Sequence, residues 1–314
     1  MEIVEVVSRA ACFCAIILLG YSLRRAGFFK PEDFHVLSKI VLKITLPASI
    51  VFSFSDKVID VSMLLLSLIG LGAGVIYLCL GFLLNIGAPK EKKAFELLNL
   101  AGYNIGNFTL PFVQSFLGSS GVVATSLFDT GNAVICLGGA YSVAAIVNGG
   151  EGKKEKKKGS IASSGMQVIK TLLKSVPFDA YLIMTALCLL HIRLPQPIVS
   201  FSEIIANGNA FLAMLMIGVG FKLSGDRTQV GTIVKLLSVR YGVAAVLSLT
   251  LYFLLPVPLE YRQALAVLPF APFASAAPAF TGDLKGDIGL SSAINSISIM
   301  ISICCIVGIL VLVL

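Results

Sequence analysis

The sequence predicts an all-α integral membrane protein, and its composition and its long uncharged stretches both indicate this fold class. Of the 314 residues, 57% are hydrophobic and 13% are charged, whereas soluble domains carry about 25% charged residues. The mean hydropathy is +0.93. Uncharged stretches at 61–89, 97–128 and 288–314 are each longer than the ~20 residues that cross a bilayer core. These observations exclude an ordinary soluble globular protein.

Ten membrane-spanning helices are expected when the chain is divided at its polar segments and its Gly and Pro breaks. The expected spans are 4–24, 34–54, 61–86, 95–117, 121–148, 176–192, 198–220, 231–254, 263–282 and 287–313. Seven cysteines all fall inside apolar segments without a CxxC pair or a nearby histidine cluster. We therefore expect neither a metal site nor a cofactor.

The basic residues predict the orientation of these spans. Of the 24 Lys and Arg residues, 17 lie in or beside the connections that follow odd-numbered spans, and four lie on the other side. The positive-inside rule makes the first set cytoplasmic, so both termini face outward across the cell membrane. Membrane topology explains the net charge of +7 better than nucleic-acid binding does. We expect the chain to contact membrane lipid. It could also form a homodimer.

A polar segment rich in Gly, Ser and Lys divides the chain into two halves. Residues 149–165 read as a flexible cytoplasmic linker, between a first repeat at 1–148 and a second at 166–314. Each half holds five expected spans, and an odd number forces the second half to insert with the opposite orientation. This arrangement is the inverted repeat of many secondary transporters.

The fourth and ninth spans are expected to be broken helices. The fourth contains Gly102, Gly106 and Pro111, and the ninth contains three prolines, the last of which is Pro278. Proline removes a backbone donor and clashes with the preceding turn. Irregular backbone at membrane depth is tolerated where it is buried in protein or lines a water-filled cavity, and half-helices that start there present free N–H groups to an anion. The alternative is a pair of helices kinked for structural reasons.

Polar side chains at these depths are the candidates for substrate binding. Asn104 and Asn107 are three residues apart and could donate to a carboxylate, or could instead hydrogen-bond between helices. Asn132 lies near the acid of the fifth span, and Ser275 is a polar candidate of the ninth span.

The acid of the fifth span, Asp129, is the candidate coupling group because an intramembrane carboxylate is functional by default. It could carry a proton, or it could form a fixed ion pair with a lysine such as Lys43 of the second span. Arg240 in the eighth span is expected to extend toward its helix end, as long basic side chains do.

Several segments resemble the auxin efflux carrier family, whose plant members are PIN-type auxin transporters. The resemblance runs over nearly the whole chain and depends on G-F-F-K-P-E-D and L-P-A-S-I, on N-I-G-N-F-T-L-P, and on A-A-P-A-F-T-G-D-L. Thr109 replaces a glycine usual in the family, and Val176 stands where an asparagine often precedes Pro177.

The resemblance implies a secondary transporter for a small organic anion, an auxin or another organic acid such as malate. It implies that the broken fourth and ninth helices cross at proline and that transport follows an elevator-type movement. By position, Asn104 and Pro111 would lie at the substrate site, and Pro278 would be the crossing proline of the second half.

Two other functions compete with this interpretation. A sodium-coupled bile acid symporter has a similar fold but usually needs acidic and amide ligands around the crossed helices. The Gly118–Gly121 segment fits the G-x-S-G of an intramembrane serine protease, with Ser120 as nucleophile and His35 or His191 as base. A four-residue match is a weak motif, so a turn is the favoured interpretation, and no enzymatic activity is expected.

Overall fold

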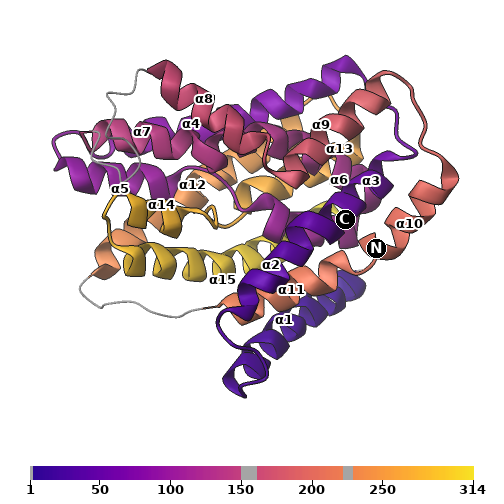
Figure 1. The fold of residues 1–314 in the computed structure, drawn as a ribbon, viewed down its shortest axis with the longest axis horizontal. Helices are drawn as coiled ribbons and strands as arrows, with labels where there is room; N and C mark the ends of the chain where they lie inside the picture. Colours follow the sequence, from indigo (N-terminus) through magenta and orange to yellow (C-terminus); the bar gives the residue numbers. More distant parts are fainter. Residues whose placement is uncertain (1–2, 150–160, 222–228) are drawn as a thin grey trace.

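The structure, a computed structural model, describes residues 3–149, 161–221 and 229–314 (Figure 1). Of the described residues, 82% are helical, which confirms the predicted all-α class. Within the described ranges, bridge pairing is confined to one isolated antiparallel bridge between Tyr103 and Phe273.

The described helical elements are distributed over both halves of the chain. The first half holds α1 (Ile3–Arg25), α2 (Asp33–Ile40), η1 (Val41–Thr45), α3 (Leu46–Phe54), η2 (Val61–Leu64), α4 (Leu65–Leu83), α5 (Lys90–Leu100), η3 (Ile105–Thr109), α6 (Leu110–Val134), η4 (Ile135–Gly139) and α7 (Ala140–Val147). The second half holds α8 (Ile161–Leu172), α9 (Val176–Leu189), α10 (Gln196–Ala206), α11 (Asn209–Gly220), α12 (Val230–Leu254), α13 (Leu259–Val267), η6 (Leu268–Phe270), α14 (Ala277–Asp283) and α15 (Ile288–Val313).

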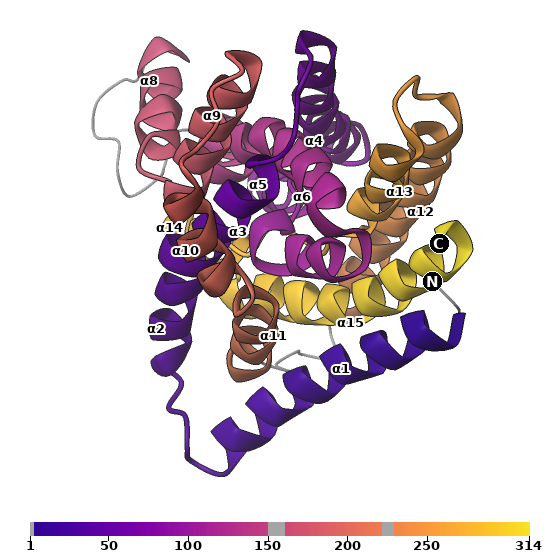
Figure 2. The same cartoon turned by 90° about the vertical axis from the view of Figure 1, so that its right-hand side faces the viewer.

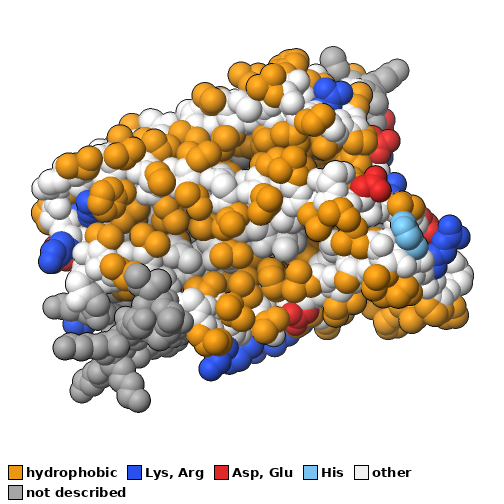
Figure 3. All heavy atoms as spheres, turned by 90° about the horizontal axis from the view of Figure 1, so that it is seen from above, with side chains coloured by type: hydrophobic (Ala, Val, Ile, Leu, Met, Phe, Trp, Pro, Cys, Tyr) orange, Lys and Arg blue, Asp and Glu red, His pale blue; other side chains and the backbone are white. Residues whose placement is uncertain are grey.

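Among the described residues, seven continuous helical segments are long and apolar enough to cross a membrane. One of them, Ile105–Val147, has 43 residues, but Gly118 inside it has φ 59° and ψ −154°. This non-helical glycine separates the fourth expected span from the fifth. The sixth expected span corresponds to the shorter apolar helix α9. Figure 3 shows hydrophobic side chains over much of one face, with most charged side chains toward the ends of the long axis. The chain is therefore a multi-pass membrane protein.

Both predicted interruptions are present and they meet each other. The first crossing segment, residues 101–104, follows α5, and the second crossing segment, residues 271–276, follows η6. The Tyr103–Phe273 bridge joins them, and the Asn104 N–H donates to the Pro272 carbonyl at 2.9 Å. Backbone groups left unpaired by the broken helices thus find partners in each other.

A glycine is required at the first crossing segment. Gly102 has φ +83°, and a Cβ there would lie 2.6 Å from the Cys136 sulfur. Both the left-handed backbone and the close approach of α6 and η4 favour a residue without a side chain.

One boundary and one expected role differ from the sequence interpretation. Helix α8 begins at Ile161, inside the segment expected to be linker, because residues 161–172 alternate apolar and polar positions with helical spacing. Residues 150–160 of that linker lie outside the described residues. The crossing lies at Tyr103 and Phe273, so Pro278 is not the crossing residue; it stands near the start of α14, where a missing N–H is tolerated.

The helices pack as two groups, visible in Figure 2. In the first helix group, α1 packs on α11, α11 on α2, and α3 on both α9 and α10. In the second helix group, α4 packs on α5 and α6, α5 on α7 and α14, α12 on α13, α13 on α6, and α14 on α15. Helices α3, α9 and α11 of the first group touch α6 of the second.

Candidate functional site

A cavity of about 430 Å³ lies beside the crossing and is called here the crossing cavity. Its lining comes from both helix groups: Phe34, Ser38, Leu42, Lys43, Leu46 and residues 174–178 with Tyr181 on one side, and residues 103–107, Asp129, Asn132, Ala133, Cys136, Leu137 and residues 274–276 on the other. This volume is typical of small-molecule sites.

Six of the eight site residues expected from the sequence line this cavity. They are Asn104, Asn107, Asn132, Ser275, Asp129 and Lys43. The two prolines do not line it: Pro111 is buried near the start of α6, and Pro278 lies in α14. The structure therefore brings the polar candidates together and assigns the two prolines to helix starts.

Asn104 offers an amide to the cavity. Its side chain makes no hydrogen bond within the described part of the chain, while its backbone N–H is used at the crossing. It directly precedes η3, whose first N–H groups have no acceptor within the helix. The free amide and the helix start together provide hydrogen-bond donors for an anion.

Asn107 and Ser275 link the two broken spans at the cavity wall. The Asn107 Nδ2 donates to the Ser275 Oγ at 3.4 Å, a weak bond, and the buried Asn107 Oδ1 has no partner among the described residues. Both side chains therefore retain hydrogen-bonding capacity for a ligand.

Asp129 is held by two hydrogen bonds rather than by an ion pair. Its Oδ1 accepts from the Asn132 Nδ2 at 2.7 Å, and its Oδ2 accepts from the Tyr181 hydroxyl at 3.0 Å. No nitrogen of Lys43 lies within 4.0 Å of its carboxylate, so the fixed ion pair considered from the sequence is not formed. Because Tyr181 belongs to α9 and Asp129 to α6, this bond connects the two helix groups.

The Asn132 side chain hydrogen-bonds to the backbone of the first crossing segment. Its Oδ1 accepts the Tyr103 N–H and its Nδ2 donates to the Tyr103 carbonyl, both at 3.0 Å. The side chain is 1% exposed. Its amide thus pairs with Tyr103 as a neighbouring strand would, and it fixes the position of the residue before Asn104.

Lys174 and Tyr181 line the cavity but were not identified from the sequence. Lys174 lies two residues before the sixth expected span, where it was counted with the basic residues of the loops. Tyr181 carried no distinguishing signal, because a single tyrosine in an apolar helix is ordinary. Their importance follows from the packing of α9 against the crossing.

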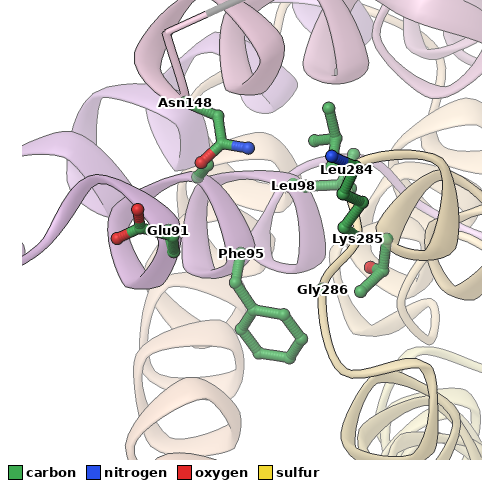
Figure 4. A pocket seen from close by; sticks show the side chains of 9 residues that line it. Glu91, Phe95, Leu98, Asn148, Leu284, Lys285 and Gly286 are labelled. Atoms are coloured by element: carbon green, nitrogen blue, oxygen red, sulfur yellow. The ribbon is translucent and has the colours of Figure 1, made fainter. Parts of the chain in front are cut away.

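Two smaller pockets lie elsewhere. One, of about 210 Å³, is lined by residues 54–58 after α3 and by residues of α9 and the following turn, including Lys57, His191 and Arg193. The crossing cavity lies near the other ends of the same two spans. A pocket of about 190 Å³ is shown in Figure 4, between Glu91 and Phe95 of α5, Asn148, and residues 284–286. It contains none of the expected site residues.

The described residues form neither the serine–histidine pair of the protease alternative nor a metal site. The Ser120 hydroxyl accepts a hydrogen bond from the Lys57 Nζ at 2.9 Å, so its partner is a lysine rather than a histidine. No group of three or more His, Cys, Asp and Glu side chains in the described ranges could hold a metal ion.

Comparison with known proteins supports a transport function. The model of a family described as membrane transport protein matches residues 6–310, which is nearly the whole chain. No curated protein matches it. The matching family is a transport family and not an enzyme family. The chain therefore belongs to the auxin efflux carrier family of membrane transport proteins.

Proposed function

We propose that this protein is a secondary transporter that carries a small organic anion by alternating access. The observation that carries the proposal is the crossing itself: two interrupted spans exchange backbone hydrogen bonds beside a cavity that contains a free asparagine amide. Broken helices that meet near the membrane midplane are the usual substrate site of such transporters.

The charges around the crossing cavity favour an anion. Lys43 and Lys174 line it, and so do residues 105–107 at the start of η3, where the helix dipole is positive. Among the described residues that line it, Asp129 is the only carboxylate. A negative substrate and a deprotonated Asp129 repel each other, so binding of the anion and binding of a proton to Asp129 support each other. This relation makes Asp129 the proposed proton-coupling residue.

The two helix groups suggest how the substrate is moved. The crossing cavity lies between them, and the 210 Å³ pocket lies at the other ends of α3 and α9. An elevator-type displacement of the second helix group along the first would expose the crossing to each side in turn. We propose ten spans arranged as two inverted repeats, at 1–148 and 166–314.

The topology proposed from the basic residues agrees with this arrangement. The start of α1 and the end of α15 lie near one another at the same end of the molecule (Figures 1 and 2). With the termini outside, the cavity lined by Phe34 and Lys174 opens toward the cytoplasm, because both residues stand at the cytoplasmic starts of their spans.

A binding screen with matched neutral compounds tests the substrate class. Purified protein is melted with malate, benzoate and an auxin, and with the corresponding amides, which have similar shape but no charge. A ligand that binds only the folded state raises the melting temperature. We expect stabilisation by one or more acids and none by the amides. Equal stabilisation by an acid and its amide would contradict an anion site.

Uptake into proteoliposomes tests transport. The anion found in the screen should be accumulated when the lumen is made alkaline and should exchange with internal anion in counterflow. Binding without counterflow would contradict a carrier function. Uptake that requires sodium would instead favour the symporter alternative.

A further inference from the structure

Arg240 is the most deeply buried charge of the described chain. It lies in the middle of α12 and is 0% exposed, so the expectation that it reaches toward its helix end is wrong. Taking a guanidinium out of water is costly unless its donors and its charge are satisfied. The groups that satisfy it are therefore informative.

The guanidinium donates to the last carbonyl of α5 and to the backbone of the second crossing segment. Nη1 donates to the Leu100 carbonyl at 3.2 Å, and Nη2 donates to the carbonyls of Ala271 at 3.1 Å and Pro272 at 3.4 Å. Leu100 ends α5, and Ala271 follows η6. These are carbonyls at the C-terminal ends of the two interrupted helices, where the helix dipole is negative.

Aromatic rings provide the rest of its surroundings. The guanidinium carbon lies 4.0 Å from the ring centroid of Tyr103, 4.5 Å from that of Tyr77 and 5.2 Å from that of Phe273. Tyr103 and Phe273 are the two residues of the bridge. No carboxylate of the described residues lies within 4.0 Å of Arg240. Its close partners among the described residues are therefore carbonyl oxygens and ring faces, and its buried Nε has no hydrogen-bond partner among them.

This is the environment that transporters with broken helices use for a coupling cation. Unwound carbonyls and the C-terminal ends of half-helices coordinate sodium in such proteins, and a hard cation requires several oxygen ligands. Here the carbonyl oxygens already accept from a guanidinium. A metal ion and Arg240 cannot both use them.

We propose that Arg240 is a built-in cation of the crossing: it replaces a dissociable metal ion and holds the two crossing segments in register, so that no sodium is needed there. The proposal goes beyond anion transport, because it concerns the ion requirement of the crossing. Arg240 acts as a positioning residue, since it is not among the described residues that line the cavity but contacts Tyr103, which does line it.

Two substitutions separate charge from volume. Arg240→Lys keeps a cation, whereas Arg240→Met keeps a long apolar side chain and removes the charge. Melting temperatures are measured at constant ionic strength with sodium, choline or low millimolar guanidinium as the chloride salt. We expect the wild type and Arg240→Lys to melt alike in sodium and in choline. Arg240→Met should melt lower, and sodium or guanidinium in tenfold excess over its dissociation constant should raise its melting temperature by about 2–4 °C.

The outcomes decide the proposal and are independent of the substrate. It is overturned if Arg240→Lys and Arg240→Met are destabilised equally, or if Arg240→Met responds to neither cation, because charge would then not be what the crossing requires. If Arg240→Met does not fold, Arg240→Lys decides: a folded, sodium-independent protein supports the built-in cation, and an unfolded one shows that guanidinium shape, not charge, is needed. Failure of anion binding in the wild type would leave these results unchanged and would count against the proposed function alone.

Discussion

At the scale of single residues, two asparagines that look alike in the sequence have different environments. Asn104 and Asn132 both line the crossing cavity. Asn132 uses its amide to pair with the Tyr103 backbone, whereas the Asn104 side chain has no partner within the described residues. Asn132 is therefore expected to fix the backbone, and Asn104 is expected to bind the ligand.

Alanine substitutions should separate these two roles. Asn104→Ala removes a donor to an anion, and a charge-assisted hydrogen bond contributes about 1.5–3 kcal/mol, so affinity should fall roughly 10- to 150-fold with little change in melting temperature. Asn132→Ala leaves the Tyr103 N–H buried and unpaired, which costs about 1–3 kcal/mol of stability. Isothermal titration calorimetry measures the affinity, and melting curves measure the stability. Unchanged affinity together with a lower melting temperature for Asn104→Ala would assign it to helix packing.

Substitution of Asp129 should distinguish a role in proton coupling from a purely structural role. Asp129→Asn mimics the neutral acid and can still accept from Tyr181, so it should bind the anion and support counterflow but lose uptake driven by a pH gradient. Because no ion pair with Lys43 is broken, a loss of the 3–5 kcal/mol typical of an orphaned buried charge is not expected.

Tyr181→Phe is the matched control for Asp129, because it removes the hydrogen bond across the two helix groups and leaves the carboxyl in place. It should keep the dependence on the pH gradient. Uptake by proteoliposomes at equal and unequal pH measures both variants. Intact pH-driven uptake in Asp129→Asn would rule out the coupling role.

At the scale of elements, helix α15 has a charged cap outside the membrane span. The Asp287 carboxylate accepts from the Leu290 N–H at 2.8 Å and from the Gln229 side chain at 2.7 Å. These hydrogen bonds hold the pKa of Asp287 below its usual value. A lowered pKa in the folded state means that the cap stabilises at neutral pH and that this contribution is lost as the pH falls.

Asp287→Ala should therefore destabilise the protein in a pH-dependent way. Loss of such a cap costs about 0.5–2 kcal/mol, and we expect the lower part of this range because the carboxylate is exposed. The difference from wild type should be full at pH 7 and should shrink below about pH 4, where the unfolded acid also becomes protonated. Asp60→Ala is the control, since Asp60 precedes η2 without a side-chain cap bond. A difference that is constant with pH would contradict the charge effect.

A partly buried ion pair joins α5 to α12. The Lys235 Nζ lies 2.6 Å from the Glu96 Oε2, and Asn85 bonds to both residues. Glu96 is 1% exposed. The pair fixes the half-helix before the first crossing segment against the helix that carries Arg240.

Removing one member of this pair should cost more than removing both charges. Lys235→Met leaves the buried Glu96 carboxylate uncompensated and should lower stability, by less than the about 3–5 kcal/mol typical of a fully buried pair because Lys235 is partly exposed. The double variant Glu96→Gln with Lys235→Met should lose less. Chemical denaturation in detergent of the two single variants and the double variant completes the cycle. Additive losses would show that the two side chains do not interact energetically.

At the scale of the whole molecule, several polar side-chain contacts connect the two helix groups. The bonds of Lys57 with Ser120 and of Tyr181 with Asp129 lie at opposite ends of α3 and α9. Arg9 with Ser115, and Gln114 with Ala206 and Asn209, also connect α6 to the first group. The contacts of Arg24 with Val219 and Phe221 instead lie inside the first helix group. Relative movement of the groups should therefore break the first kind of contact and preserve the second.

Crosslinking should distinguish these contacts in a variant without native cysteines. A flexible bifunctional thiol reagent across Lys57→Cys and Ser120→Cys should stop counterflow while leaving anion binding measurable. The same reagent across Arg24→Cys and Phe221→Cys, inside one group, should leave counterflow intact. Counterflow before and after reduction of the link measures both. Undiminished counterflow in the crosslinked Lys57 and Ser120 pair would contradict movement between the groups.

The sequence by itself determined the membrane class and the two interruptions. These features depend on local properties: the length of the uncharged stretches, and the effects of Gly102 and the prolines on the backbone. The polar candidates could also be found, because an amide or a carboxylate is expensive at membrane depth wherever it points.

The tertiary structure alone decided which of these groups meet. The bridge between Tyr103 and Phe273 joins residues far apart in the chain. The same is true of the hydrogen bonds between Asn132 and the Tyr103 backbone, and of the contacts that bury Arg240 beside the crossing segments. Lys43 and Asp129 were a reasonable ion pair by depth, yet Asn132 and Tyr181 satisfy the carboxylate instead. The depth of a side chain in the membrane follows from its position along a helix. Its partners depend on how the helices rotate and pack, and local sequence patterns do not reveal that packing.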